Sequence, residues 1–319
     1  MIYPMVFLTP GYGIAERVKV TTENDIIRAD FTQASLSQFS EWRRFKRVFF
    51  SRGIVLFGLI VLLLLGFTAI FSAWLAPYNP YQPGVANPLV QPCIEHPLGS
   101  DLLGRDTLSR LIYGSRTALM VGFISVGIAS VIGITLGLIA GYFGGVPFMI
   151  IMRSMDALMA FPMILLALVV AAVLGGGIQN VIIALSVAII PGYARISCGL
   201  TLSIRENDYV LAERAIGSSN LRVMIGHILP NAFPPLIALM TMQLGSLILA
   251  EASLSFLGIG IEPPGAAWGA MVNDGYKYLM RNPVLSFAPG LAIMLVVFAF
   301  NMVGDGLRDA LDPKLRGKL

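Results

Sequence analysis

Apolar segments of membrane-spanning length alternate with short polar segments along this chain. At 1.5 Å per residue, about 20 apolar residues cross a hydrocarbon layer that is roughly 30 Å thick. Stretches of this kind predict transmembrane helices at residues 54–76, 117–140, 157–174, 178–196, 232–260 and 285–304. Pro162 and Pro191 fall inside two of them, and a packed helical bundle tolerates such prolines as kinks. The pattern predicts an all-α polytopic membrane protein with six transmembrane helices.

Composition supports the membrane assignment and excludes other classes. Of 319 residues, 56% are hydrophobic and 13% are charged, which a soluble core does not require. The net charge of +4 does not indicate nucleic-acid binding, because the basic residues sit beside apolar spans without interleaved aromatic residues. With six spans and both ends inside, 17 of the 22 Lys and Arg residues are cytoplasmic and 5 are outside. This split follows the positive-inside rule.

Both ends of the chain are predicted to be cytoplasmic tails. Residues 1–52 form the first tail; Met1 to Leu8 lack the basic residues that begin a signal peptide, so we expect no cleavage. Aromatic and basic residues alternate at helical spacing in residues 41–52, which predicts an amphipathic helix at the membrane surface. Residues 53–76 are the first transmembrane helix, and residues 306–319 are the C-terminal tail.

A polar island at residues 203–231 interrupts the apolar pattern. Its charged residues are too costly for the bilayer centre, at about 2.5–3.5 kcal/mol each, so the island must project into water. A first helix is predicted to end at Gly217, and a second, at residues 221–229, to start after Ser218, Ser219 or Asn220 and to stop at Pro230. The alternative is a solvated loop that only joins two spans. Such a loop would leave the apolar residues of the island without a partner to bury them (Tyr209, Val210, Leu211, Ile216, Val223, Met224, Ile225).

This island resembles the cytoplasmic "EAA" loop of permeases in ATP-binding-cassette (ABC) importers. Ala212, Gly217, Leu229 and Pro230 match its pattern, which has Glu where this chain has Leu211 and Ala where it has Glu213. The resemblance implies that the loop is gripped by an ATPase subunit. The implied coupling residues are Tyr209, Ala212, Glu213, Ile216 and Gly217.

Residues 77–114 form a proline-rich extracytoplasmic loop in this topology. Asp106 or Thr107 is predicted to open a short interfacial helix that Gly114 closes. The stretch from His96 to Leu119 is similar to the dipeptide, oligopeptide and nickel permease family. Asp101, Arg105 and Asp106 are candidate contacts for a substrate or a binding protein, although local caps and ion pairs are the favoured interpretation.

The resemblance extends, in order, through most of the chain after residue 95. The matching segments are residues 141–145, 152–162, 250–271 and 300–313, and together they look like the second permease subunit of a peptide-type importer. This implies a type I ABC importer permease fold with a five-helix core at residues 115–305. It also implies a bacterial or archaeal cytoplasmic membrane and three kinds of partner: a homologous permease subunit, two ATPase subunits and an extracytoplasmic solute-binding protein.

Three polar or small-residue features inside the spans are open to more than one interpretation. Glu251 is an intramembrane acid, for which helix packing is favoured over substrate contact. The lone His227 is expected to be a hydrogen-bonded structural residue, and we predict no metal site. Gly133 and Gly137 form a GxxxG pair that favours close helix packing over a pore lining.

No catalytic motif is present in the sequence. A GxxxxGK[ST] phosphate-binding loop is absent, as are HExxH and GxSxG, so we expect a transport subunit that is not an enzyme and binds no cofactor, with ATP and Mg on partner chains. The alternative is a self-sufficient ion-coupled secondary transporter, but the halves show no convincing repeat. The solute stays open among dipeptides, oligopeptides, glutathione-like compounds, opines and nickel complexes.

Overall fold

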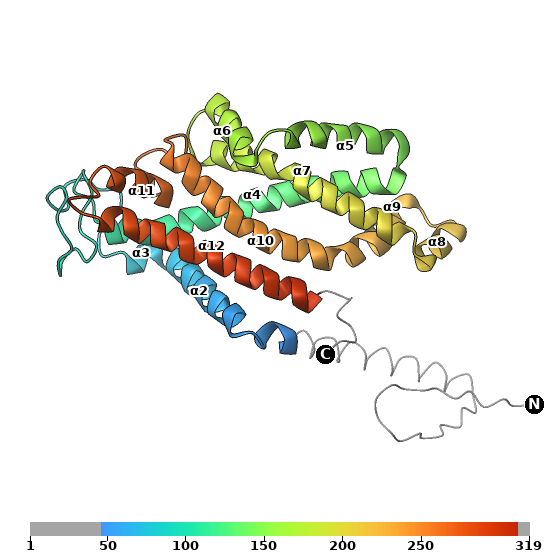
Figure 1. Ribbon diagram of the computed structural model, residues 1–319, viewed down its shortest axis with the longest axis horizontal. Coiled ribbons are helices and arrows are strands. Elements are labelled where there is room, and N and C mark those ends of the chain that lie inside the picture. Colours follow the sequence, from blue (N-terminus) through green and yellow to red (C-terminus); the bar gives the residue numbers. More distant parts are fainter. Residues whose placement is uncertain (1–45, 312–319) are drawn as a thin grey trace, which may run out of the picture. The chain divides into compact units, whose positions relative to one another are not determined.

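The computed structural model describes residues 46–311, and the regular elements in that range are helices (Figure 1). The predicted N-terminal tail, residues 41–45 of the amphipathic segment and residues 312–319 of the C-terminal tail lie outside the described residues. The helices are α2 (Gly53–Ile70), α3 (Ser72–Leu75), α4 (Thr107–Phe143), α5 (Gly145–Met159), α6 (Met163–Leu174), α7 (Ile178–Arg205), α8 (Asp208–Ala215), α9 (Asn220–Val223), the π-helical η1 (Met224–Ile228), α10 (Leu229–Phe256), α11 (Trp268–Tyr276) and α12 (Val284–Leu311).

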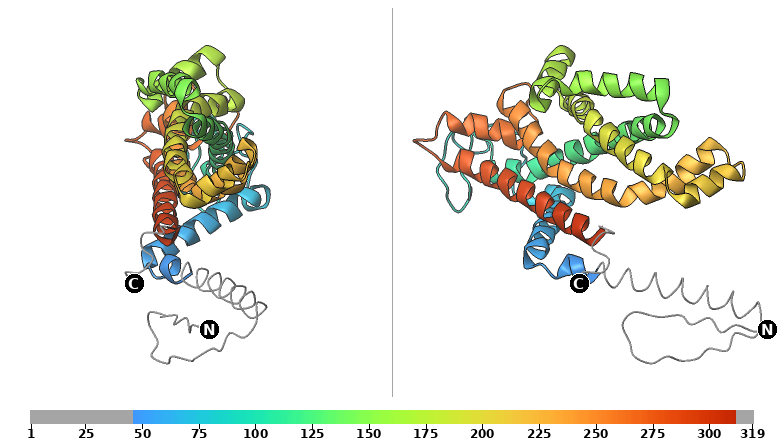
Figure 2. Two further views of the ribbon diagram at one scale, coloured as in Figure 1. Left: turned by 90° about the vertical axis from the view of Figure 1, so that its right-hand side faces the viewer. Right: turned by 45° about the vertical axis from the view of Figure 1, so that its right-hand side comes forward.

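Five helical segments within residues 46–311 are long and apolar enough to cross a membrane: α2, α4, α7, the continuous run from α9 through α10, and α12. The bent pair α5 and α6 makes a sixth if it counts as one span. The all-α membrane architecture is therefore confirmed. We call the end of the bundle that carries α8 and α9 the hairpin end, and the opposite end, with residues 77–106 and α11, the loop end (Figures 1 and 2).

The packing of α4 against α7 depends on small residues. These helices run in the same direction, and Gly133, Gly137 and Gly141 of α4 face the backbone of α7. A Cβ atom added at Gly133 would lie 2.6 Å from Cβ of Tyr193, and one at Gly141 would lie 2.7 Å from Cβ of Thr201. The close approach expected for the GxxxG pair is thus present, and it extends one further turn to Gly141. Larger residues would separate the two helices.

Gly137→Ala is expected to destabilise the protein, by about 1–3 kcal/mol, because its Cβ would collide with the carbonyl oxygen of Ala194. Gly127→Ala is the matched control, since no atom lies within 4 Å of a Cβ built there on the same helix. The stability of both variants is measured by thermal unfolding of the purified proteins in detergent. Equal melting temperatures would show that α4 and α7 do not need this contact.

The expected third span, residues 157–174 with a kink at Pro162, is broken instead of kinked. The axes of α5 and α6 differ by 89°, and Pro162 is the N-cap of α6 with extended ψ of 134°. Proline disfavours helical geometry in the residue before it and cannot donate a backbone N–H, so the helix ends at this point. The segment that precedes Pro162 is also helical, and α5 packs along α7 and α4.

The second helix of the island does not stop at Pro230, contrary to expectation. The helical run continues from α9 through η1 into α10. Pro230 occupies the first turn of α10, directly after the wider turn of η1. The side-chain amide of Asn231 donates to the His227 carbonyl at 2.7 Å and adds a local bond beside Pro230. The wider turn of η1 directly before Pro230 lets the proline sit inside a continuous helix.

Two further boundaries at the loop end differ from the expectation. Gly114 does not close a short helix, because α4 runs unbroken from Thr107 to Phe143 and Gly114 makes room for the indole of Trp268. The expected outer loop, residues 261–283, contains α11. Gly269 and Gly275 of α11 lie against the backbone of Ala252 and Leu285, so α11 packs on α10 and α12. Hydropathy alone does not reveal such a short helix.

Candidate functional site

The hairpin at residues 206–220 has the turn that the sequence predicts. Gly217 ends the first helix with φ of +83°, a conformation that residues with a Cβ rarely adopt. Its N–H donates to the Arg214 carbonyl, and the N–H of Ser218 donates to the Glu213 carbonyl, both at 3.1 Å. The Ser219 hydroxyl accepts from the N–H of Arg222 and caps α9. The predicted helix end and the cap are confirmed.

A small apolar core fixes the hairpin to the end of α4. Val210 of α8 and Val223 of α9 are fully buried, together with Met224 and Ile228, against Leu138 and Tyr142. The Tyr142 hydroxyl donates to the side-chain oxygen of Asn220 at 2.9 Å. The hairpin is therefore held on the bundle by packing as well as by its chain connections, and it is not a free loop.

Glu213 occupies the centre of the hairpin. One carboxylate oxygen accepts from the Ser218 hydroxyl at 2.6 Å, and the other lies 3.5 Å from Nε2 of His227. Glu213 stands where the family pattern has Ala. Its carboxylate connects the turn after α8 with η1. His227 has a hydrogen-bonding environment here, and within residues 46–311 no three His, Cys, Asp or Glu side chains gather closely enough to hold a metal ion.

The outer face of the hairpin carries exposed apolar side chains, which we call the hairpin patch. Ile216 is 78% exposed and Leu221 is 65% exposed. The patch comprises Tyr209, Leu211, Ala212, Ile216, Leu221 and Ile225. Of the apolar residues that the sequence marked as needing a cover, Val210, Val223 and Met224 are buried against α4, whereas Tyr209, Leu211, Ile216 and Ile225 stay exposed. Four exposed charged residues, Glu206, Asp208, Arg214 and Arg222, lie on the same hairpin, so lipid chains are an unfavourable cover for the patch.

At the loop end, Asp101, Arg105 and Asp106 have local partners. Asp106 is the N-cap of α4 and accepts from the N–H and the hydroxyl of Ser109, at 2.8 and 2.7 Å. Its other oxygen lies 2.9 Å from Nδ1 of His96, and both side chains of this pair are buried. Asp101 accepts from Nε of Arg105 at 2.6 Å. These contacts tie the proline-rich loop to the start of α4.

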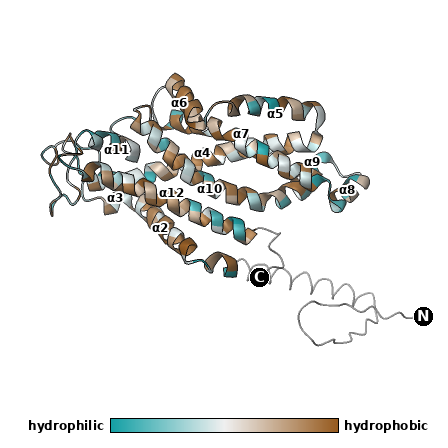
Figure 3. Cartoon of the chain, in the orientation of Figure 1, coloured by the Kyte–Doolittle hydropathy of each residue, from teal (hydrophilic) through white to brown (hydrophobic). Residues whose placement is uncertain are grey.

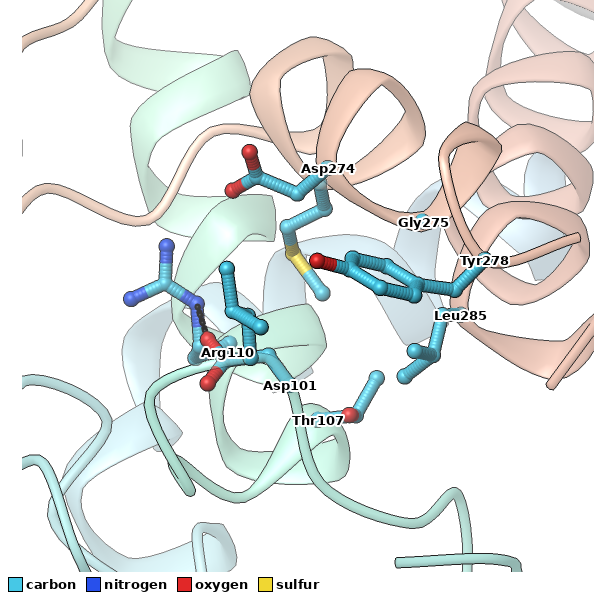
Figure 4. A pocket seen from close by; sticks show the side chains of 9 residues that line it. Asp101, Thr107, Arg110, Asp274, Gly275, Tyr278 and Leu285 are labelled. Atoms are coloured by element: carbon cyan, nitrogen blue, oxygen red, sulfur yellow. Dashed lines mark ion pairs between the residues drawn. The ribbon is translucent and has the colours of Figure 1, made fainter. Parts of the chain in front are cut away.

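Arg110 is a residue at the loop end whose role sequence reasoning missed. Its buried guanidinium donates to the carbonyls of Pro80, Pro264 and Gly265 and lies 3.7 Å from Asp101 (Figure 4). It therefore joins segments that are more than 150 residues apart. A cavity of about 20 Å³ beside it is lined by residues that include Thr107, Asp274 and Tyr278. No local motif signals such a junction; a charged residue on the first turn of a long apolar helix is the available clue.

The intramembrane acid Glu251 is buried within α10. Its carboxylate accepts from the Ser255 hydroxyl, one turn later, at 2.7 Å. The same hydroxyl accepts from the N–H of Ile261 at 3.4 Å, beyond the end of α10. Glu251 is thus linked through Ser255 to the chain that leaves the helix. Glu251 lies in the last two turns of α10, and this end of α10 is at the loop end, opposite the hairpin (Figure 1).

Two known protein families together match most of the described chain, except residues 93–132. Residues 133–317 match the family described as "Binding-protein-dependent transport system inner membrane component". Residues 40–92 match the "N-terminal TM domain of oligopeptide transport permease C". The first match covers more than half of the chain and includes α5 to α12 with the hairpin.

Similar proteins carry related descriptions. The dipeptide transport system permease protein DppC of Alkalihalophilus pseudofirmus is 40% identical over 87% of this chain and 91% of its own length. The glutathione transport system permease protein GsiD of Escherichia coli O157:H7 is 41% identical over 94% of this chain and 98% of its own. GsiD of Pectobacterium atrosepticum is 43% identical over 86% and 92%.

Solved structures share the fold. Two inward-facing crystal forms of the MetNI methionine ABC transporter contain a chain with TM-scores of 0.52 and 0.53, at 22% identity over 64% of this chain and 96–97% of theirs. The fold is thus the type I importer permease fold that the sequence motifs implied. With these matches and the multi-pass architecture, the chain belongs to the family of binding-protein-dependent transport system inner membrane components, the permease subunits of ABC importers.

Proposed function

We propose that this permease works beside a homologous permease subunit and is driven by two ATPase subunits, one of which docks on the hairpin patch. In this arrangement the hairpin end and both termini are cytoplasmic, and an extracytoplasmic solute-binding protein delivers the solute at the loop end. ATP and Mg act on the ATPase chains, and this chain binds neither. Alternating access between the two permease subunits moves the solute.

The exposed hairpin patch is the observation that carries this proposal. Tyr209 and Ala212 of α8 and Ile216 at its C-cap lie one turn apart and are exposed, and this is the spacing by which a helix docks into a groove. Glu213 and Gly217 belong to the same unit, since one braces the turn and the other forms it. No specific observation favours an ion-coupled transporter acting alone.

We further propose that the solute is a dipeptide, an oligopeptide or a peptide-like compound such as glutathione. Two descriptions among the relatives support this class, one naming dipeptide transport and one naming glutathione transport. These solutes have in common a free carboxylate, a free ammonium group and at least one amide bond. Asp101, Arg105 and Asp106 serve this function by shaping the loop end, through their caps and ion pairs.

Single cysteines test the orientation and the docking together. Ser219→Cys lies on the exposed hairpin, and Met280→Cys replaces a fully exposed residue at the loop end; Cys93 and Cys198 are first replaced by Ser. A membrane-impermeant thiol reagent should label position 280 from outside and position 219 from the cytoplasmic side. Assembly with the ATPase subunits should slow labelling at position 219. Same-side labelling contradicts the orientation, and unchanged labelling at 219 contradicts the docking.

A further inference from the structure

An ion pair joins α5 and α7 on the surface of the bundle. Asp156 of α5 accepts from Arg195 of α7, and their side chains are 45% and 55% exposed. Arg153, one turn earlier on α5, is also exposed. Charged residues on this surface contrast with the apolar residues around them, and Figure 3 shows α5 as a hydrophobic helix with hydrophilic positions between the hydrophobic ones.

The ion pair lies at the depth of an apolar part of α4. Arg195 follows Ala194, which packs against Gly133 and Gly137 of α4. These glycines are six to ten residues from the end of α4 at Phe143, or about 9–15 Å at the helical rise. From Thr117 to Phe143 the helix carries no charged side chain. The sequence placed Arg153 and Asp156 before the third span and counted Arg153 and Arg195 as cytoplasmic. In the structure α5 instead packs beside α7 and α4, along part of their length (Figure 2).

Exposed charges beside this uncharged part of α4 are unfavourable in contact with lipid chains. Each would cost about 2.5–3.5 kcal/mol at the bilayer centre, and charged side chains in spanning segments typically face a bundle interior or a water-filled cavity. Burial in this chain does not solve the problem, because about half of each side chain is accessible. The exposed surface formed by α5 and α7 is therefore expected to face water or the homologous permease subunit rather than lipid.

The charge of this surface selects the kind of group that it can bind. Arg153, Asp156 and Arg195 together carry one net positive charge. Among the described residues, Arg195 has one hydrogen-bonding partner, a carboxylate oxygen of Asp156. A guanidinium has five N–H donors in a planar fork that matches a carboxylate, so donors remain for a second carboxylate. Asp156 orients the Arg195 guanidinium and competes with a second carboxylate for it. This competition limits the affinity for a solute carboxylate, and a site that must release its solute requires limited affinity.

We propose that α5 and α7 form a wall of the translocation cavity and that Arg195 on this wall binds a carboxylate of the passing solute. This inference rests on the proposed function and adds a residue and a solute group to it. The inference requires that water reach this wall. It also requires that the electrostatic potential at the wall favour anions over cations. Both requirements can be measured without measuring uptake.

Two positions on the wall suit a reactivity test. Ala157 and Gly199 are exposed, and each is one turn after Arg153 or Arg195 on the same helix. In the assembled transporter without Cys93 and Cys198, cysteine at either position should react with water-soluble thiol reagents in at least one nucleotide state. A sulfonate reagent should react faster than an ammonium reagent. Leu63→Cys is the control, because Leu63 is an exposed residue in the middle of the uncharged helix α2 and should react with neither.

Changing Arg195 should change the charge preference. Arg195→Gln should slow the sulfonate reagent about tenfold at position 199 and leave the ammonium reagent at least as fast, whereas Arg195→Lys should retain the preference for the anion. A peptide with a free carboxylate should protect position 199 better than its C-terminal amide. The proposal would be overturned if the cysteine at position 199 reacted as slowly as the one at position 63 in every nucleotide state. It would also be overturned if the rate at position 199 did not depend on the charge of the reagent. Copurification of the ATPase subunits should be unaffected in these variants, so failure here is distinguishable from failure of hairpin docking.

Discussion

Gly217→Val is expected to abolish solute uptake and solute-stimulated ATP hydrolysis while the protein is still inserted and assembled with its sister permease. Gly217 has φ of +83°, and a β-branched residue there meets a steric cost on the order of 1–3 kcal/mol. No atom lies within 4 Å of a Cβ built at this position, so the cost comes from the backbone and not from a neighbour. Relaxing that strain turns α8 relative to α9 and separates the docking residues. Gly217→Ala should be milder.

Reconstituted complexes of equal abundance give the measurement, with uptake and ATPase activity read in parallel. Gly66→Val is the matched control: Gly66 lies within helix α2, and no atom is within 4 Å of a Cβ built there. It should insert and transport normally. If Gly217→Val also transports normally, the hairpin is a connection between two spans and not a coupling element.

Ile216→Asp is expected to prevent the ATPase subunits from binding. Ile216 is 78% exposed on the hairpin patch, so its replacement removes no packing within this chain. A docked partner would have to bury the new carboxylate without a counter-charge, which costs several kcal/mol and lowers affinity by at least about a hundredfold. Truncation of Tyr209 to Ala should weaken the association less. Copurification and titration of the ATPase subunit against the permease in detergent measure both effects.

Glu206→Gln is the control for this prediction. Glu206 lies at the same end of the molecule, at the end of α7, and its exposed side chain pairs with Arg205 outside the hairpin patch. It should bind the ATPase subunits with nearly normal affinity, because an exposed ion pair contributes about 0–1 kcal/mol. Normal binding by Ile216→Asp would place the docking surface elsewhere on the chain.

The sequence by itself determined the fold class, the membrane architecture and the position of the hairpin. Residues 54–76 form an uncharged apolar stretch that is long enough to cross a bilayer, so hydrophobicity alone predicts a spanning helix there. Gly217 and Ser219 specify a helix end and a helix start through their own backbone and side-chain chemistry. The small residues Gly133 and Gly137 likewise predict a close helix contact. Each of these signals is local, so it can be read without a structure.

Tertiary structure decided what depends on contacts between distant segments. It made Gly114, an expected helix end, a helical position beside Trp268. It also kept the chain helical through Pro230, which directly follows the wider turn of η1. It placed Asp156 beside Arg195 and brought Arg110 to three carbonyl oxygens of two loops. Hydrophobicity and helix caps act within a few residues, whereas these pairings form between helices and loops that meet only after the chain has packed. The candidate wall of the translocation cavity depends on such pairings, because α5 and α7 come together only in the packed bundle.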